Sequence, residues 1–144
     1  MFSKACEYGI RASTYIALQS LQGKRVSLKG IAAEINSPVA FTAKILQQLS
    51  KHNIVESVKG AGGGFEIERT NIDTIKLSDI VRAIDGDKVY AGCVLGLEEC
   101  NADKPCPVHN KYAHIRDNLR HMLEDTSLND MTAGLGAGLT YLKL

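Results

Sequence analysis

The sequence predicts a mainly α-helical fold with a small β wing: a winged helix-turn-helix followed by a long C-terminal dimerisation helix. Hydrophobic residues recur at helical spacing over residues 3–52, and two short β-type segments then flank a run of glycines. A further helical pattern opens at Pro107 and is long enough to pair with a second copy of itself. The 144 residues, 44% hydrophobic and 23% charged, suffice for one compact domain.

The front half of the chain is predicted to form three helices. We expect them at residues 3–22, 28–35 and 38–52. Gly23 ends the first helix, and Ser27 is placed to cap the second with its side chain. The third helix follows a turn, with Ser37 as its cap and Pro38 at the first helical position, and Asn53 ends it in a left-handed conformation.

Two strands joined by a flexible tip come next. Residues 54–58 and 65–69 have the composition of short strands, and the second alternates apolar with charged residues. The tip between them is the glycine run over residues 60–64. This run matches neither of the common phosphate-loop patterns and no helix follows it, which argues against a nucleotide site.

The back half begins with a helix over residues 77–84. A loop over residues 88–106 then holds three of the four cysteines, and the helix from Pro107 extends to about Leu123. The last segment, residues 127–144, is rich in glycine and carries weak signals of order, so we expect a flexible tail.

Charge is distributed unequally along the chain, although its formal net value is only +1. Residues 1–69 carry nine Lys/Arg against five Asp/Glu, whereas residues 70–144 carry eight against eleven. A basic front half and an acidic back half favour a polyanion-binding module followed by a sensing or assembly module. Chance scatter of charges is the alternative.

The third predicted helix has one apolar and one polar face. Phe41, Ile45 and Leu49 anchor it, and the opposite face is suited to the major groove of DNA, which admits a single helix. Glutamine can pair with adenine, and lysine can bind guanine or phosphate. The residues expected on this face are Thr42, Lys44, Gln47, Gln48 and Lys51. A merely solvated face is the alternative interpretation.

Other residues around this helix are expected to hold the DNA backbone. Lys29, Ser37 and Thr42 are predicted phosphate contacts, which fix register without reading sequence. In the wing, Lys59 is predicted to bind DNA, and Gly62 and Gly63 allow the backbone to approach a groove closely.

The cysteines of the long loop have the arrangement of a metal centre. Cys93, Cys100 and Cys106 are spaced C-x6-C-x5-C, and His109 follows the last by three residues. Three thiols and one imidazole supply four ligands, and Cys106 lies at a helix start, where a thiolate is favoured. Cys6 stands apart on an apolar helix, where we expect a buried structural thiol.

Three chemistries compete for these ligands. Zinc usually takes ligand pairs of tighter spacing, and a thiol–disulfide switch needs only two cysteines and leaves His109 without a role. An iron–sulfur cluster tolerates long loop spacings and is the favoured interpretation. Catalysis finds no support, because no set of nucleophile, base and orienting group emerges, so we do not expect an enzyme.

These patterns divide the chain into three parts. They are a winged helix-turn-helix DNA-binding module (1–75), a cluster-binding loop with a dimerisation helix (76–126), and the tail (127–144). No apolar run is long enough to span a membrane, and the N-terminus lacks the layout of a signal peptide. We therefore expect a cytoplasmic protein with no membrane partner, in a compartment where thiols stay reduced.

The chain also resembles the Rrf-type winged-helix transcriptional regulators, which include IscR-like, NsrR-like and CymR-like proteins. The resemblance rests on residues 6–12 (Cys-Glu-Tyr-Gly-Ile-Arg-Ala), on residues 58–65 (Val-Lys-Gly-Ala-Gly-Gly-Gly-Phe) and on the three-cysteine loop. It implies a homodimer, joined by the helix after the loop, that binds a palindromic operator in double-stranded DNA. It also implies a cluster that changes DNA affinity when it is oxidised, nitrosylated or lost.

The resemblance further implies two versions of the cluster. In IscR-like members a 2Fe–2S cluster is held by three cysteines and a histidine, and Cys93, Cys100, Cys106 and His109 match that order with a first gap one residue longer. NsrR-like members take the fourth ligand from an acidic residue in the first helix of the partner subunit. Glu7 matches that residue, which would favour 4Fe–4S; we expect 2Fe–2S.

At position 43 this sequence departs from the pattern of the IscR-like proteins. IscR-like proteins carry a glutamate in the recognition helix that the cluster state repositions, and here the matching residue is Ala43, so that specificity switch is expected to be absent.

The function expected from the sequence is a sequence-specific transcriptional regulator, most simply a repressor, that senses iron–sulfur, redox or nitric oxide status. One alternative is a DNA-binding regulator with a thiol-redox or zinc switch and no iron–sulfur cluster. Another, from a different class, is a cluster-handling redox protein without a DNA role.

Overall fold

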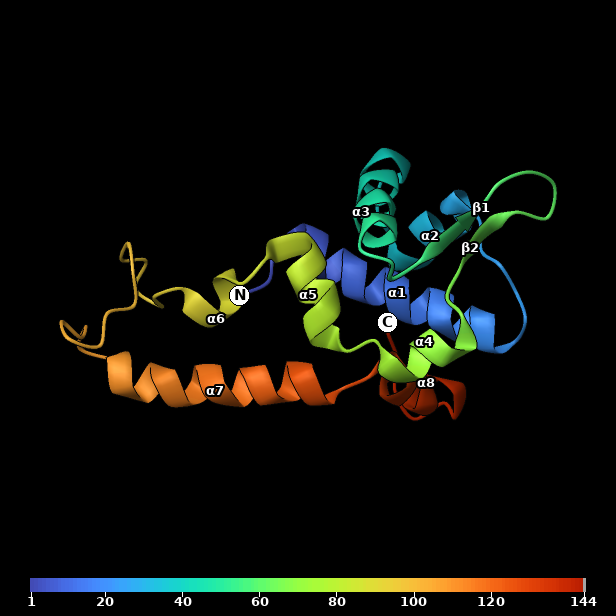
Figure 1. The fold of residues 1–144 in the computed structure, drawn as a ribbon. Helices are drawn as coiled ribbons and strands as arrows, with labels where there is room; N and C mark the ends of the chain where they lie inside the picture. The colour runs from blue at the N-terminus through green and yellow to red at the C-terminus, as the bar shows by residue number, and fades with distance from the viewer. Residues whose placement is uncertain (144) are drawn as a thin grey trace.

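The computed structural model describes residues 1–143 as a mostly helical, elongated molecule (Figure 1). Its elements in chain order are α1 (Lys4–Leu21), α2 (Leu28–Ile35), α3 (Val39–Lys51), β1 (Glu56–Val58), β2 (Gly64–Glu66), α4 (Arg69–Thr74), α5 (Leu77–Asp85), α6 (Lys88–Ala91), α7 (His109–Asp125) and α8 (Leu128–Gly136). The predicted fold class is confirmed, with α4 and α6 as additional short helices.

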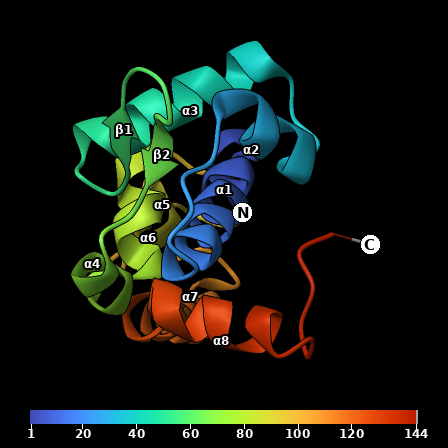
Figure 2. The ribbon, with the colours of Figure 1, turned by 90° about the vertical axis from the view of Figure 1, so that its right-hand side faces the viewer.

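The first helix is the centre of the molecule. α1 packs against α2, α3, α5 and α8, so it lies between the wing side and the C-terminal side of the fold (Figure 2). Cys6, Ala12, Ile16 and Ala17 are fully buried on it. Ser3 caps the helix by accepting a hydrogen bond from the backbone amide of Cys6, and this capping fixes where the helix begins.

The helix-turn-helix is formed by α2 and α3. The side chain of Ser27 caps α2 through the amide of Gly30, as predicted. Asn36 turns the chain in the left-handed conformation with φ 53°, and Asn53 ends α3 in the same way with φ 58°. The predicted capping role of Ser37 is wrong, because Pro38 occupies the cap position and Ser37 makes no capping bond.

The wing is a two-stranded antiparallel hairpin. β1 pairs with β2 so that Glu56 faces Glu66 and Val58 faces Gly64. Both strands are shorter than the sequence predicts, because Ile54, Val55 and Ile67 leave the ladder and enter the core. An isolated bridge between Val26 and Phe65 ties the hairpin to the chain before α2.

Helices of the back half of the chain pack against helices of the front half. α5 packs on α1, α3 and α7, and α8 packs on α1 and α4. The expectation of a flexible tail is wrong for Leu128–Gly136, since this segment is helix α8 with Leu128 fully buried. Ser127 and Asp130 form a reciprocal capping box at its start. One hydrophobic core therefore runs from Cys6 to Leu128.

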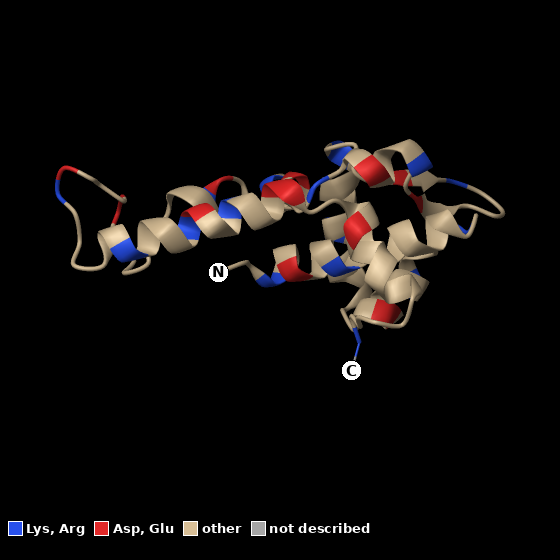
Figure 3. Cartoon of the chain, turned by 90° about the horizontal axis from the view of Figure 1, so that it is seen from below, with Lys and Arg blue, Asp and Glu red and all other residues tan. Residues whose placement is uncertain are grey.

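The cysteine loop and the wing lie at opposite ends of the molecule. α7 extends away from the body and leads to the loop at one end, whereas the hairpin projects at the other (Figure 1). Along α7 both signs of charge occur, and Arg120 pairs with Glu124 at 3.9 Å (Figure 3). The acidic excess of the back half is therefore not a uniformly acidic surface. Within residues 1–143, the helices are too short or too polar to cross a membrane.

Candidate DNA interface and cysteine site

One face of α3 is anchored in the core and the other is free for a ligand. Ile45, Leu46 and Leu49 are at most 1% exposed. The four long polar side chains of the opposite face are exposed, as predicted: Lys44, Gln47, Gln48 and Lys51. Lys29 is also exposed, on the neighbouring helix α2. These residues present the amide and ammonium groups that DNA bases and phosphates bind.

Two of the predicted contact residues do not belong to this surface. Thr42 is fully buried, and its hydroxyl donates to the carbonyl of Pro38 at 2.9 Å. The prediction that it faces outward is wrong, and the spacing to Ile45 and Leu49 already places it on the apolar face. The hydroxyl of Ser37 is buried with no partner, so its geometry does not support a phosphate contact either.

Sequence reasoning missed an apolar residue at the start of α3. Val39 is the first residue of the helix and remains 44% exposed. The N-terminal residues of a recognition helix are those that contact base edges, and small apolar side chains there can touch the thymine methyl group. The signal was available in the sequence, since Pro38 marks the helix start.

The wing has the backbone that its glycines allow. Lys59 is exposed, and Gly60 and Gly62 adopt φ values of 92° and 73°, which other residues rarely adopt. A side chain at Gly63 would overlap the carbonyl oxygens of Val58 and Gly60. The amide of Gly63 donates to the carbonyl of Gly60 at 3.0 Å, so it is engaged within the turn.

The cysteine loop brings its four predicted ligands together in two pairs. All three loop cysteines are free thiols and half-buried. The Cys100 Sγ lies 3.3 Å from the His109 Nδ1. Backbone hydrogen bonds at Leu97 and Leu95 lower the pKa of the Cys93 thiol, and the nearby Cys106 thiol lowers it further.

The side chains of the two pairs do not converge on one position where a single metal ion could bind. Among residues 1–143, no three side chains of the kinds that bind metals are close enough to hold one ion. The set still fits a thiolate-held group chemically. It contains three accessible sulfurs and one ring nitrogen, all in one loop and the first residue of α7.

Glu7, the rival fourth ligand, lies in the first turn of α1. Its carboxylate is exposed and pairs with Lys4 at 3.3 Å. The neighbouring Cys6 is buried, and this burial, together with the charge of Asp85, raises the pKa of its thiol to about 12. Cys6 is therefore a neutral core residue, consistent with the structural role expected for it.

The start of the cysteine loop adjoins the start of α1. Asp85, at the end of α5, accepts a hydrogen bond from the amide of Ser3 at 2.9 Å and another from its hydroxyl. Cys93 lines a cavity of about 630 Å³ together with Ser3 and Asp85. The first cysteine of the loop therefore lies near the N-terminus of the central helix.

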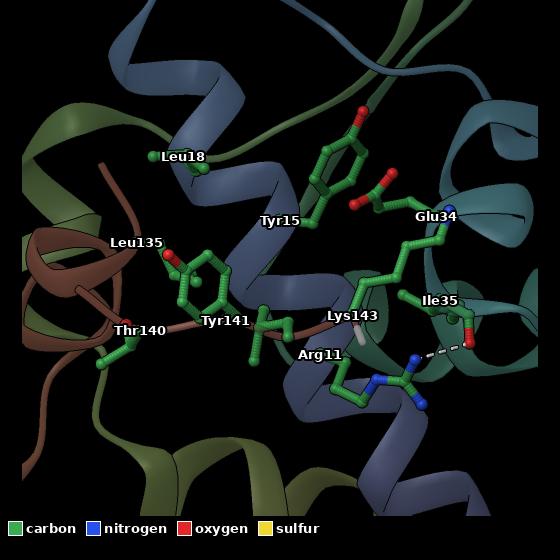
Figure 4. A pocket seen from close by; sticks show the side chains of 10 residues that line it. Arg11, Tyr15, Leu18, Glu34, Ile35, Leu135, Thr140, Tyr141 and Lys143 are labelled. Atoms are coloured by element: carbon green, nitrogen blue, oxygen red, sulfur yellow. Dashed lines mark hydrogen bonds between the residues drawn. The ribbon is translucent and has the colours of Figure 1, made fainter. Parts of the chain in front are cut away.

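A second cavity, of about 200 Å³, lies between α1, α2 and the C-terminal segment (Figure 4). Tyr15, Glu34 and Tyr141 line it, and the guanidinium of Arg11 donates to the carbonyl of Ile35 at 2.9 Å. This bond satisfies a free carbonyl at the end of α2, so Arg11 joins the first two helices.

The comparisons with known proteins decide the family. The Rrf2 family model, described as an iron-dependent transcriptional regulator, matches residues 2–134. The chain belongs to the Rrf2 family. Its Rrf2 relatives are regulators of transcription that act on DNA, in agreement with the expectation that the chain is not an enzyme.

Two relatives and one solved structure show how far the similarity extends. A protein of Aquifex aeolicus (strain VF5), named as an HTH-type transcriptional regulator, is 32% identical over 133 residues, which cover 91% of this chain and 90% of that protein. The regulator IscR of Pectobacterium atrosepticum is 26% identical over 86% of this chain and 74% of its own length. The structure of CymR, the global cysteine regulator of B. subtilis, matches with a TM-score of 0.76 at 23% identity, over 92% of this chain and 96% of CymR.

Proposed function

We propose that this Rrf2 regulator is a homodimeric repressor whose affinity for a palindromic operator depends on an iron–sulfur cluster. The proposed ligands are Cys93, Cys100, Cys106 and His109. The observation that carries this proposal is the contact between Cys100 and His109, which brings a thiol and an imidazole together at the start of α7. Bound there, a cluster would supply a centre that exchanges electrons and reacts with nitric oxide.

The operator would be bound by α3 and the wing. Lys44, Gln47, Gln48 and Lys51 are proposed to enter the major groove, with Lys29 and Lys59 on flanking phosphates. Gly62 remains proposed as a point of close backbone approach, since it is exposed at the tip. Two copies would then read two half-sites about one helical turn apart.

The exposed side of α7 supports a dimer. Ile115 and Met122 are 57% and 50% exposed and lie seven residues apart, so they share one face of the helix. A neighbouring side of the helix is anchored by Leu123, which is fully buried. A second copy of α7 would cover the exposed apolar pair, and the two cysteine loops would then lie beside the dimer interface.

The position of α5 supports coupling between the two ends. This helix packs on α7 and also on α1 and α3, so it contacts both the proposed dimer helix and the proposed recognition helix. At its end, Asp85 accepts hydrogen bonds from Ser3, the residue that caps α1. A change in the loop that moved Asp85 would therefore alter how α3 is presented to DNA.

The contact of His109 with Cys100 favours it as fourth ligand, and with it the 2Fe–2S form, over Glu7 and 4Fe–4S. Glu7 remains the rival, because its exposed carboxylate could serve the cluster of a partner subunit.

A second candidate is a thiol switch without a cluster. It is favoured by the placement of Cys93 and Cys106 in one loop as free thiols, near enough for Cys106 to lower the pKa of the Cys93 thiol. Joining them would release two protons and two electrons to an oxidant such as a peroxide, with formation of one disulfide. The similarity of the fold to CymR, which is named as a cysteine regulator, is compatible with this candidate. Zinc held by the same four donors is its metal-bound counterpart.

The test is anaerobic purification and reconstitution with iron and sulfide, followed by absorbance and Mössbauer spectra. We compare the wild type with His109→Ala and Glu7→Ala, and with Cys6→Ala as a control outside the ligand set. Loss or change of the spectrum in His109→Ala alone supports the proposal. A change confined to Glu7→Ala assigns the partner carboxylate and 4Fe–4S. A colourless wild type overturns the cluster, and metal analysis with thiol counting then separates zinc from a thiol switch.

A further inference from the structure

Arg25 lies outside both α3 and the wing, yet it binds the wing at two places. Its Nε donates to the Glu66 Oε2 at 3.0 Å, and its Nη2 lies 3.5 Å from the Glu66 Oε1. The remaining nitrogen, Nη1, donates to the carbonyl of Gly62 at 3.3 Å. One guanidinium group therefore joins strand β2 to the tip of the hairpin.

The backbone next to Arg25 explains this placement. The amide of Val26 donates to the carbonyl of Phe65 at 3.0 Å, and the amide of Phe65 donates back at 2.8 Å. A Cβ at Gly64 would lie 2.7 Å from the carbonyl oxygen of Val26, so only glycine permits this approach. The pairing holds Arg25 beside the wing as if from a third strand.

The charges of the wing favour a cation at this point. Glu56 and Glu66 face each other across the ladder, and like charges placed directly opposite destabilise a strand pair. The guanidinium of Arg25 offsets this repulsion. Because it binds the Glu66 carboxylate through two nitrogens, it also fixes the orientation of the two side chains relative to each other.

The tip beyond has little other support. Among residues 1–143, no atom lies within 4 Å of the position that a Cβ would take at Gly60 or Gly62, so this part of the hairpin is open on its side-chain face. Within residues 1–143, two hydrogen bonds restrain the tip: one from the Gly63 amide inside the turn and one from Arg25 to the Gly62 carbonyl. Glycine backbones lose much conformational freedom when ordered, so a restraint here lowers the cost of binding.

We propose that Arg25 is the positioning residue of the wing, which holds the hairpin tip so that Lys59 meets DNA, and that it does not itself bind phosphate. This proposal rests on the proposed DNA interface. The rival role, a direct phosphate contact, makes different predictions, because each neutralised phosphate adds about 0.9 to the slope of log affinity against log salt.

The experiment measures binding of the anaerobically purified full chain to a duplex of about 30 base pairs, which covers two half-sites. The duplex carries the site that the protein itself enriches from a random library. Affinities are measured by fluorescence anisotropy over a salt series for the wild type, Arg25→Ala, Arg25→Lys, Lys59→Ala and the Arg25→Ala/Lys59→Ala double variant. Thermal melts establish that each variant is folded.

We expect Arg25→Ala to weaken binding about fivefold with an unchanged salt slope, since an unrestrained tip must be ordered on binding. Arg25→Lys should be nearly as weak, because an ammonium group lacks the fork. In the Lys59→Ala background the effect of Arg25→Ala should disappear, as no contact remains to be positioned. Hydrogen exchange at the Gly63 amide should become faster in Arg25→Ala.

Two glutamates provide a matched control. Removal of an acidic group near DNA normally strengthens binding, and Glu56→Gln should do so slightly. Glu66→Gln should instead weaken binding, because it removes the anchor of Arg25.

Other outcomes overturn the proposal in distinguishable ways. Wild-type affinity in Arg25→Lys, with a slope lowered by about 0.9 in Arg25→Ala, makes Arg25 a phosphate contact. Wild-type behaviour of Arg25→Ala removes any role for the residue. If Lys59→Ala binds like the wild type, the proposed wing contact fails, and the positioning role fails with it.

Discussion

Gly9 allows the central helix α1 to approach α5, the helix that leads to the cysteine loop. A Cβ at this position would fall well inside the contact distance of the Ile84 Cδ1 atom, while the next atoms, Ile45 Cγ2 and Ile84 Cγ1, would lie at 3.6 Å, an ordinary contact. Gly9→Ala should therefore force one side chain or one helix to move. Such overpacking costs about 1–3 kcal/mol, and the better helix propensity of alanine returns about 1 kcal/mol.

Ile84→Val removes the Cδ1 atom that would clash, so it allows the clash to be tested by a double-mutant cycle. Alone, it should cost about 0.5–1.5 kcal/mol. Combined with Gly9→Ala, it should relieve the clash, so the double-mutant cycle should give a favourable coupling of about 1–3 kcal/mol in urea unfolding. Ile45→Val is the control, since it keeps the Cγ2 atom and should show no coupling with Gly9→Ala. Additive effects of Gly9→Ala and Ile84→Val would refute the close approach of α1 and α5.

Further predictions concern three residues: Thr42, Cys6 and Ser127. Thr42→Ala should lower the free energy of unfolding by about 1 kcal/mol, through loss of the bond to Pro38, and should leave the operator affinity of the folded protein unchanged; weaker binding would restore Thr42 as a phosphate contact. The Cys6 thiol, whose pKa is about 12 when folded against 9.0 as the ordinary value, should resist iodoacetamide in the native state, as mass spectrometry can measure. Because unfolding lowers that pKa, the free energy of unfolding should fall as pH rises from 9.0 to about 12, and more in the wild type than in Cys6→Ala; equal pH dependence would contradict the buried, neutral thiol. Ser127→Ala should lower the melting temperature through loss of the capping box, worth about 1 kcal/mol, and unchanged melting would mean that α8 does not depend on its cap.

Local signals in the sequence were sufficient for most helix ends in the front half of the fold. Ser27, Asn36 and Asn53 mark helix ends by side-chain capping and left-handed backbone, both of which depend on a few neighbouring residues. The tail required more than local signals. Its glycines resemble those of a mobile segment, but Leu128 gains its stability from burial against elements far away in the chain.

The candidate site shows the same division. The exposed side chains of α3 follow from helical periodicity, and Thr42 would have been placed correctly by the same rule. The approach of Cys100 to His109 needs the course of a loop, which spacing alone does not determine. No local sequence pattern indicated the role of Arg25, because its partners Glu66 and Gly62 are about forty residues away in the chain.

The most direct test of the central claim is operator affinity with and without iron, under strict exclusion of oxygen. For the wild type we expect iron-loaded and iron-free protein to differ by about tenfold or more, in the range of ordinary allosteric couplings. A variant with Cys93, Cys100 and Cys106 all replaced by serine should bind with one affinity in both conditions. If the wild type also binds equally with and without iron, the cysteine loop does not control the DNA-binding helices through a cluster, and the protein binds its operator constitutively.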